Sequence, residues 1–297
     1  MLHTTKIPLS YIFNKVKFDL LIVLFLSLLV NFLTRKFSSI LPVIPITIPV
    51  FLGTSISILL SFKLNQSYDR WWEARKIWGS VVNDSRSLVL QLQTLFPKNN
   101  DEVIKKMALR QVGWCYALGE SLRGKDPLKT MAEYLSPHDL ASIKLHSNIP
   151  LALLQLHAKD IANLREEGKL NEFSFVQIDS TLVRLCESMG KAERIKSTVF
   201  PVTYRLFLHY IIYLFVITLS ISLVDVEGYY EIPLLLGISS AFFLLEKSAT
   251  HMQDPFDGKP TDTAMTTIAR KIEINIRELL NEQNIPKPLA PENFYSI

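Results

Sequence analysis

His209 is the side chain best suited to proton chemistry, because it is the one group in the apolar stretch 207–224 that exchanges protons near neutral pH. An imidazole buried in a membrane needs a polar partner. We expect that partner to be a hydrogen-bonding group on a neighbouring helix. The six histidines are scattered singly, and HExxH, GxSxG, P-loop and CxxC patterns are absent from the sequence. The sequence therefore predicts neither an enzyme nor a bound cofactor.

The cysteines and the net charge exclude two further kinds of site. Cys115 and Cys186 are not spaced as a metal-binding or redox pair, and we predict that both are packing thiols facing the cytosol. The formal net charge is +4 at pH 7, and lysines and arginines do not form runs interleaved with aromatic residues. Such runs are typical of chains that follow a nucleic-acid backbone. We predict no metal ion and no nucleic-acid partner.

The sequence contains four apolar stretches, and His209 lies in the third. The chain has 297 residues, 48% of them hydrophobic, and a mean hydropathy of +0.21, which is too apolar for a soluble domain of this size. The stretches are 19–33, 40–62, 207–224 and 232–245. A membrane-spanning helix takes about 20 residues, so the first and fourth reach that length only with their polar flanks. The sequence predicts four membrane helices in a lipid bilayer.

The first two stretches have unusual ends. Basic residues precede the first stretch as they would in a signal peptide, but Thr34 and Arg35 follow it in place of a small-residue cleavage site. We interpret it as a membrane helix. Prolines interrupt the second stretch as far as Pro49, so we expect regular helix over 50–62.

Charge bias predicts the orientation in the membrane. The amino terminus is basic, the link 225–231 is acidic, and the large block between the second and third stretches is basic and polar. The positive-inside rule then places both termini and the block 63–200 in the cytoplasm of a cell-membrane protein. Arg35 and Lys36, in the predicted outer loop, count against this orientation.

The rest of the chain reads as helices, so the predicted fold class is all-α. Helical spacing continues from 63 to the break at Pro97, after which Asp101 is a candidate N-cap. Further helices are expected at 101–122, from Pro137, at 149–166, at 171–200 and at 266–280, followed by an extended tail. The domain boundaries are a membrane part at 1–62, a cytoplasmic helical region at 63–200, a second membrane part at 201–252 and a cytoplasmic end at 253–297.

The segment 61–79, SFKLNQSYDRWWEARKIWG, resembles the signature of prokaryotic bestrophin homologues. Its matching residues are Tyr68, Asp69, Arg70, Trp71, Trp72, Glu73, Arg75 and Trp78. Two later motifs resemble the family as well, with matching residues Pro201, Tyr204, Asp254, Pro255 and Phe256. The resemblance covers the chain from about 16 to 280.

The resemblance implies a homopentamer with one axial pore. Counting back from Arg70 to the family's narrow apolar neck gives Phe62, Ile58 and Thr54, and a second, cytoplasmic constriction is implied at Phe200. Residues four apart share a helix face, so the three neck positions form one stripe. Thr54 departs from the family's larger apolar residue, and its hydroxyl leaves the outer neck wetter. The alternative is that an apolar stripe at this spacing is ordinary core packing.

Several charged and aromatic residues have simpler interpretations than ion conduction. The tryptophans of the signature are expected to be packing anchors, and Asp69, Glu73 and Arg75 to form salt bridges. Glu246 and Lys247 are expected to form a solvated rim at the end of the fourth span. In animal bestrophins, an acidic cluster at the place of Asp254, Asp257 and Asp262 holds Ca²⁺. Here the carboxylates are sparse, and we expect no Ca²⁺ site.

By family resemblance, the expected function is passive conduction of small inorganic ions, chloride and other anions first. An apolar neck has no ring of charge to decide the sign, so a cation-selective channel of the same fold is one alternative. A non-conducting membrane scaffold or sensor is another. A carrier is disfavoured, because the sequence has no pair of broken helices in two related halves.

Overall fold

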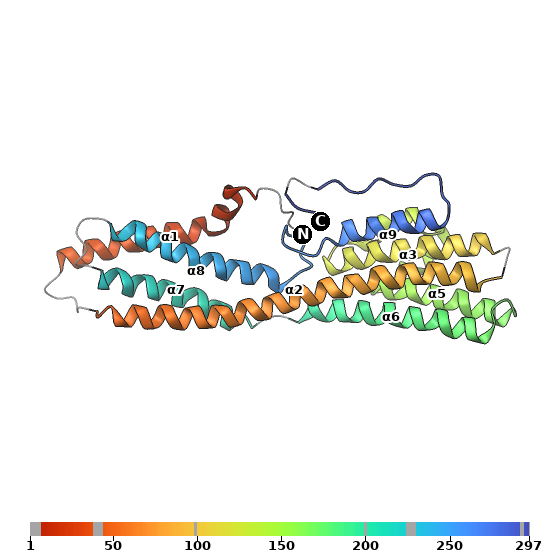
Figure 1. Cartoon of the computed structure of the whole chain (residues 1–297), viewed down its shortest axis with the longest axis horizontal. Coiled ribbons are helices and arrows are strands. Elements are labelled where there is room, and N and C mark those ends of the chain that lie inside the picture. Colours follow the sequence, from red (N-terminus) through yellow and green to blue (C-terminus); the bar gives the residue numbers. More distant parts are fainter. Residues whose placement is uncertain are drawn as a thin grey trace. The chain divides into compact units, whose positions relative to one another are not determined.

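The computed structural model describes residues 7–37, 44–97, 100–198, 201–223, 230–291 and 294–296. Within these ranges all the regular elements are helices, which confirms the predicted all-α class (Figure 1). They are α1 Leu9–Lys36, α2 Thr47–Leu95, α3 Asp101–Leu122, the 3₁₀ helix η1 Pro127–Glu133, α4 Pro137–Ile143, α5 Ile149–Glu166, α6 Glu172–Ser197, α7 Val202–Ser222, α8 Glu231–Gln253 and α9 Met265–Leu279.

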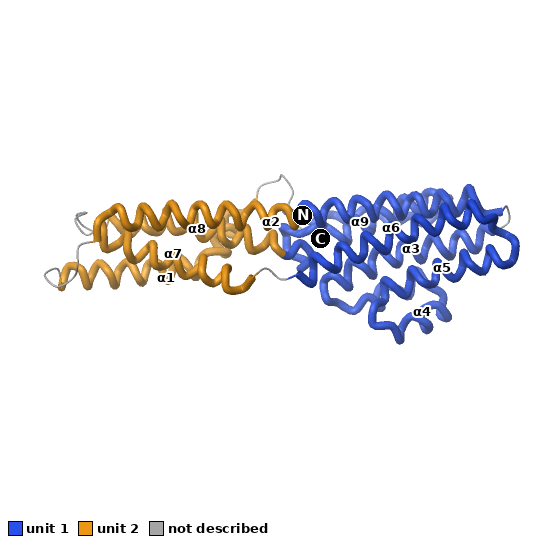
Figure 2. The backbone as a smooth tube through the Cα atoms, turned by 90° about the horizontal axis from the view of Figure 1, so that it is seen from below, with its two compact units in different colours: residues 1–3, 71–198, 254–297 blue, residues 4–70, 199–253 orange. Residues whose placement is uncertain are grey.

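The helices form two compact units, coloured separately in Figure 2. One comprises residues 4–70 and 199–253 and is called the apolar unit here. The other comprises residues 1–3, 71–198 and 254–297 and is called the polar unit. The first part of α2 belongs to the apolar unit and the remainder to the polar unit.

The apolar unit contributes the predicted membrane helices. Four helices of the described chain are long and apolar enough to cross a membrane, namely α1, α2, α7 and α8, of 28, 49, 21 and 23 residues. α1 and α8 are therefore long enough to span a membrane, because both extend well past their most apolar stretch. α2 begins at Thr47, earlier than predicted. Pro49 lies in its first turn, where a missing backbone N–H costs no hydrogen bond.

The core of the apolar unit is formed by side chains from one side of each of its four helices. α1, α7 and α8 pack side by side (Figure 1). α2 adds the buried side chains of Ile56 and Leu60. At Gly53 of α2, an added Cβ would lie 3.1 Å from the Phe215 ring of α7, so the absence of a side chain permits close approach.

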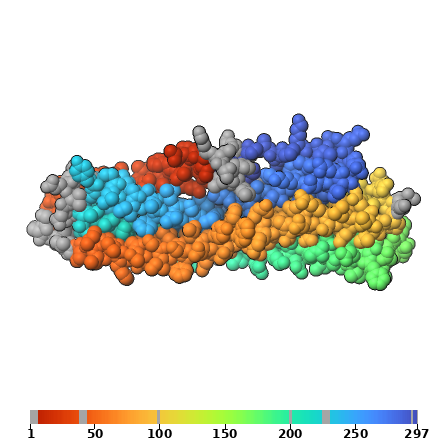
Figure 3. All heavy atoms as spheres, in the orientation of Figure 1, coloured from red at the N-terminus to blue at the C-terminus, as the bar shows by residue number. Residues whose placement is uncertain are grey.

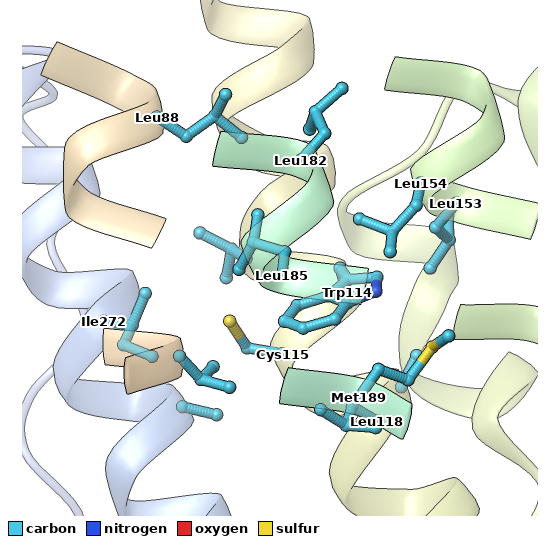
Figure 4. Packing of buried hydrophobic residues seen from close by; sticks show 14 of the residues in the cluster. Leu88, Trp114, Cys115, Leu118, Leu153, Leu154, Leu182, Leu185, Met189 and Ile272 are labelled. Carbon is cyan, nitrogen blue, oxygen red and sulfur yellow. The ribbon is translucent and has the colours of Figure 1, made fainter. Parts of the chain in front are cut away.

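The core of the polar unit surrounds α3. Figure 4 shows the Trp114 ring of α3 among side chains from α5 and α6. Its indole Nε1 donates to the Pro150 carbonyl oxygen at 3.1 Å. Cys115 is the packing thiol that was expected, and burial raises its pKa to about 12. Cys186 is not, because it lies on the exposed side of α6.

Helix ends in the polar unit follow local capping chemistry. α5 has the predicted bounds, with Asn148 Oδ1 accepting from the Leu151 N–H at 3.0 Å. α6 begins after Asn171, which accepts from Ser174. The N-cap prediction for Asp101 was wrong, because Asn100 occupies that position and Asp101 is the first helical residue. A carboxylate there still faces the positive end of the helix dipole.

Candidate functional site

The stripe formed by Thr54, Ile58 and Phe62 faces away from the core of the apolar unit. Ile58 and Phe62 are 54% and 61% exposed, whereas Ile56 and Leu60 on the opposite side of α2 are buried. Thr54 is exposed as well. In the surface view, atoms of the first part of α2 (orange) are visible at the surface (Figure 3). The stripe is therefore not packed in the core of its own chain, which removes the alternative interpretation of these residues.

Hydroxyl groups accompany the apolar side chains on this face. Thr54, Ser57 and Ser61 each donate to the carbonyl oxygen four residues earlier, at 2.9, 2.8 and 2.8 Å. These hydroxyls satisfy their own donors within the helix and hold no other helix in place. Neither they nor the apolar residues between them carry charge. The face is thus a neutral surface on which hydroxyl groups lie beside Ile58 and Phe62.

The signature after the stripe ties α2 to the end of α8 and to the segment that follows it. Within the apolar unit, Arg70 Nε donates to the Gln253 carbonyl oxygen at 2.8 Å. Within the polar unit, Trp71 Nε1 donates to the Thr261 carbonyl oxygen at 2.9 Å. Trp78 is fully buried in the polar core. Arg70 and Trp71 thus hold backbone carbonyl groups, and Trp78 fills the core.

The other signature residues on α2 are exposed or half-buried: Tyr68, Asp69, Trp72, Glu73 and Arg75. Glu73 forms an ion pair with Lys76 at 2.6 Å. The Trp72 ring stacks on the Trp71 ring, with centroids 6.3 Å apart. Half of the Trp72 side chain remains exposed in the single chain. An aromatic surface of this kind is typical of subunit contacts and membrane interfaces.

The motif at the start of α7 also positions α2. Pro201 occupies the N-cap position of α7. The Tyr204 hydroxyl donates to the Leu59 carbonyl oxygen of α2 at 3.0 Å. The predicted constriction at Phe200 lies outside the described residues.

The acidic segment after α8 is held by lysines. The Lys196 ammonium contacts Asp254 at 2.6 Å and Asp257 at 2.8 Å, and Lys259 contacts Asp257 at 2.7 Å. Phe256 between them is fully buried, and Pro255 accepts from the Thr263 N–H through its carbonyl oxygen.

These carboxylates do not fit a Ca²⁺ site. That ion takes six or more oxygen ligands, and here ammonium groups already occupy Asp254 and Asp257. Asp262 is turned away into the protein, where burial raises its pKa to about 6. Across the ranges that the structure describes, no group of three or more His, Cys, Asp and Glu residues could hold a metal ion.

The apolar unit contains a buried ion pair that sequence reasoning missed. Lys63 Nζ lies 2.9 Å from Glu246 Oε1, and the two side chains are 0% and 4% exposed. The prediction of a solvated rim is wrong for Glu246, because α8 does not end there but continues to Gln253. Helical spacing offered the signal: Lys63 follows Ile56 and Leu60 on the packed side of α2.

His209 lies near acidic side chains of two neighbouring helices, at ion-pair distances rather than in the hydrogen bond that was expected. Its Nε2 atom lies 3.5 Å from Asp19 of α1, and its Nδ1 atom lies 3.9 Å from Glu246 of α8. Asp19 also accepts from the Tyr213 hydroxyl at 2.9 Å and contacts Lys247 at 3.3 Å. Lys247 is thus half-buried in the bundle rather than solvated at a rim. The polar groups of all four helices meet inside the apolar unit.

Comparisons with known proteins agree with this arrangement. The family described as Bacterial/Fungal Bestrophin protein matches residues 2–278. The voltage-dependent anion channel-forming protein YneE of Escherichia coli is 32% identical over 248 residues, which are 83% of this chain and 80% of that protein. The voltage-dependent anion channel-forming protein of Mesorhizobium japonicum is 30% identical over 264 residues, 89% of this chain and 84% of its own length.

A solved structure is similar as well. The crystal structure of a bacterial bestrophin homologue from Klebsiella pneumoniae is 27% identical, with a TM-score of 0.85, and the match covers 91% of this chain and 100% of the other. The signature at 61–79, the membrane helices and the near-complete family match lead to one conclusion: this chain belongs to the bestrophin family.

Proposed function

We propose that copies of this chain assemble as a homopentamer around one axial pore and pass small inorganic ions passively across the cell membrane. The observation that carries the proposal is the outward position of Ile58 and Phe62 on a helix whose other side packs into its own subunit. Exposed apolar side chains in a membrane protein meet lipid or other copies of the chain. The hydroxyls of Ser57 and Ser61 beside them favour other copies and water, because lipid gains nothing from a row of hydroxyls.

The physics of such a ring explains how it would conduct. Symmetry brings the same stripe from every copy to the axis, so Thr54, Ile58 and Phe62 stack as three layers. The two apolar layers stay dry when narrow, and they conduct once widened enough to hold water. Thr54 makes the outer layer wetter than the inner two. Phe200, next to the start of α7, is proposed as a second constriction.

Anions such as chloride are the proposed permeant ions. The relatives that are 32% and 30% identical are named as voltage-dependent anion channel-forming proteins. The stripe has no charge of its own to reject either sign, so a cation channel of the same fold is the second candidate. The charge bias of the sequence supports an orientation with the termini and residues 63–200 in the cytoplasm.

The test is a reversal-potential measurement on purified protein in planar bilayers under asymmetric potassium chloride. Unitary currents that reverse near the chloride equilibrium potential support an anion channel, and reversal near the potassium potential supports a cation channel. A silent bilayer containing intact oligomers, counted by native mass spectrometry, would favour a scaffold or sensor. Saturating transport without unitary currents would indicate a carrier.

A further inference from the structure

Lys63 follows Phe62 directly, yet one side chain is buried and the other is exposed. Phe62 is 61% exposed, whereas the Lys63 side chain is fully buried. Successive residues of an α-helix are turned by about 100°. Whatever fixes Lys63 toward the helical bundle therefore fixes Phe62 away from it.

Two contacts fix Lys63. Its Nζ atom lies 2.9 Å from Glu246 Oε1 and donates to Thr250 Oγ1 at 2.9 Å. Both partners belong to α8 and are one helical turn apart. Thr250 in turn donates to the Glu246 carbonyl oxygen at 2.9 Å. The ammonium group is thus held from two directions by one rigid helix.

Stability alone does not explain a buried ion pair between α2 and α8. Removing both charges from water costs about as much as their attraction returns, so a buried pair is a weak source of stability. What it provides is direction, because a short charged contact is lost on rotation while apolar contacts such as those of Ile56 and Leu60 tolerate it. Buried polar pairs are best attested as devices that set register.

The surrounding groups leave the pair intact. Glu246 Oε2 faces His209 Nδ1 at 3.9 Å, and Asp19 is matched by Lys247 at 3.3 Å. The two acids and two lysines balance. Among the residues that the structure describes, Glu246 is the acid with which Lys63 forms an ion pair.

We infer that the Lys63–Glu246 pair is a positioning device for the neck: it sets the rotation of α2 about its axis and so holds Phe62 toward the neighbouring copies. The inference rests on the proposed function and adds to it residues that do not touch the ion path. Its consequence is that the width of the proposed neck depends on a contact made on the far side of the pore helix.

The test replaces both partners at once. The double variant Lys63→Met with Glu246→Met removes the charges without leaving one unpaired, so the protein is expected to fold and melt at or above the wild-type temperature. The open–closed equilibrium is expected to change by about fivefold or more, the low end of coupling between conformational states. The exchanged variant Lys63→Glu with Glu246→Lys is expected to restore it.

A second readout does not depend on current. Phe62→Cys is introduced with Cys186→Ser, since Cys186 is exposed and Cys115 is buried. Copies that face one another at position 62 cross-link under mild oxidation by copper phenanthroline. The yield is expected to fall in the double-methionine background and to return in the exchanged one.

Three outcomes decide the matter. The inference is supported if the double-methionine variant shows a changed open–closed equilibrium and a lower cross-linking yield, and the exchanged variant restores both. Unchanged gating and unchanged cross-linking in a folded methionine variant overturn it while leaving the channel proposal standing. Absence of both current and cross-linking in the unaltered background overturns the proposed neck and the inference with it.

Discussion

The outward faces of α1 and α2 differ in polarity. On α1, polar residues turn inward and large apolar residues turn outward: Asp19, Ser27, Asn31 and Thr34 are at most 7% exposed, whereas Phe18 and Phe25 are 68% and 64% exposed. On α2, the hydroxyls of Thr54, Ser57 and Ser61 lie outside and Ile56 and Leu60 lie inside. The two helices thus differ in what they expose: the outward face of α1 is apolar, and that of α2 mixes hydroxyl and apolar side chains.

The difference indicates what each face meets. A helix that hides its polar groups and displays aromatic and aliphatic ones is matched to lipid. The exposed face of α2 is mixed, because the hydroxyls of Thr54, Ser57 and Ser61 lie among exposed apolar side chains. Those apolar residues are Ile48, Val50, Phe51, Ile58 and Phe62. In the proposed assembly, α1 faces the bilayer and α2 faces the pore, where Ile58 and Phe62 form the dry layers.

The largest expected effect is that of a charge placed on each face. Phe25→Asp puts a carboxylate in hydrocarbon, at a cost of about 2.5–3.5 kcal/mol per subunit, and assembled protein in the membrane should fall sharply. Ser57→Asp should assemble normally and shift the reversal potential toward cations. Membrane yield and asymmetric-salt currents measure both. Equal loss of assembly in the two variants would contradict the assignment of the faces.

Truncating one phenylalanine on each helix should separate conduction from packing. Phe62→Ala widens the proposed neck and should raise unitary conductance or open probability by about twofold or more, because the constriction stays wet. Phe32→Ala, on the outward face of α1, is the matched control and should leave currents unchanged. Single-channel recording gives the answer, and identical traces for both would remove Phe62 from the pore.

Polar groups should matter more on the hidden side of α1 than on the displayed side of α2. Asn31 Nδ2 donates to Glu231 Oε1 at 2.6 Å, and both residues are buried. Asn31→Ala leaves a buried acceptor unpaired and should destabilise by about 1–3 kcal/mol. Ser57→Ala should stay within about 0.5 kcal/mol. Thermal unfolding in detergent compares them, and equal shifts would argue against the inverted polarity of α1.

The smallest effect is expected at the outer layer of the stripe. Thr54→Ile adds an apolar side chain where the hydroxyl keeps the neck wet, and open probability should fall by about twofold or less. Thr54→Ser, which keeps the hydroxyl, should behave as wild type. Recordings at fixed voltage distinguish the two. An increase in open probability for Thr54→Ile would indicate that this layer does not limit hydration.

Much of this architecture follows from sequence because hydropathy and capping are local. The apolar stretches predicted the four candidate membrane helices, and the predicted bounds of α5 agree with the structure, in which Asn148 caps its start. The position of the neck came from family resemblance, whereas its outward direction needed the packing of Ile56 and Leu60.

What failed depended on contacts between distant segments. Glu246 looked like the end of a span because charge normally marks the membrane edge, yet its partner Lys63 lies 183 residues away. Cys186 was predicted to be a packing thiol because it is not spaced with Cys115 as a metal or redox pair, but its side chain is exposed. The periodicity of α2 could have indicated that Lys63 is buried. The sequence around Lys63 could not have identified Glu246 as its partner.

The lysine clamp on Asp254 and Asp257 has its own consequence. Lys196 supplies a positive charge that is covalently part of the polypeptide, and its contacts with the two aspartates raise its pKa, although burial opposes them. A tethered cation cannot be diluted away or removed by a chelator. The order of this segment should accordingly persist in calcium-free solution and loosen with rising ionic strength instead.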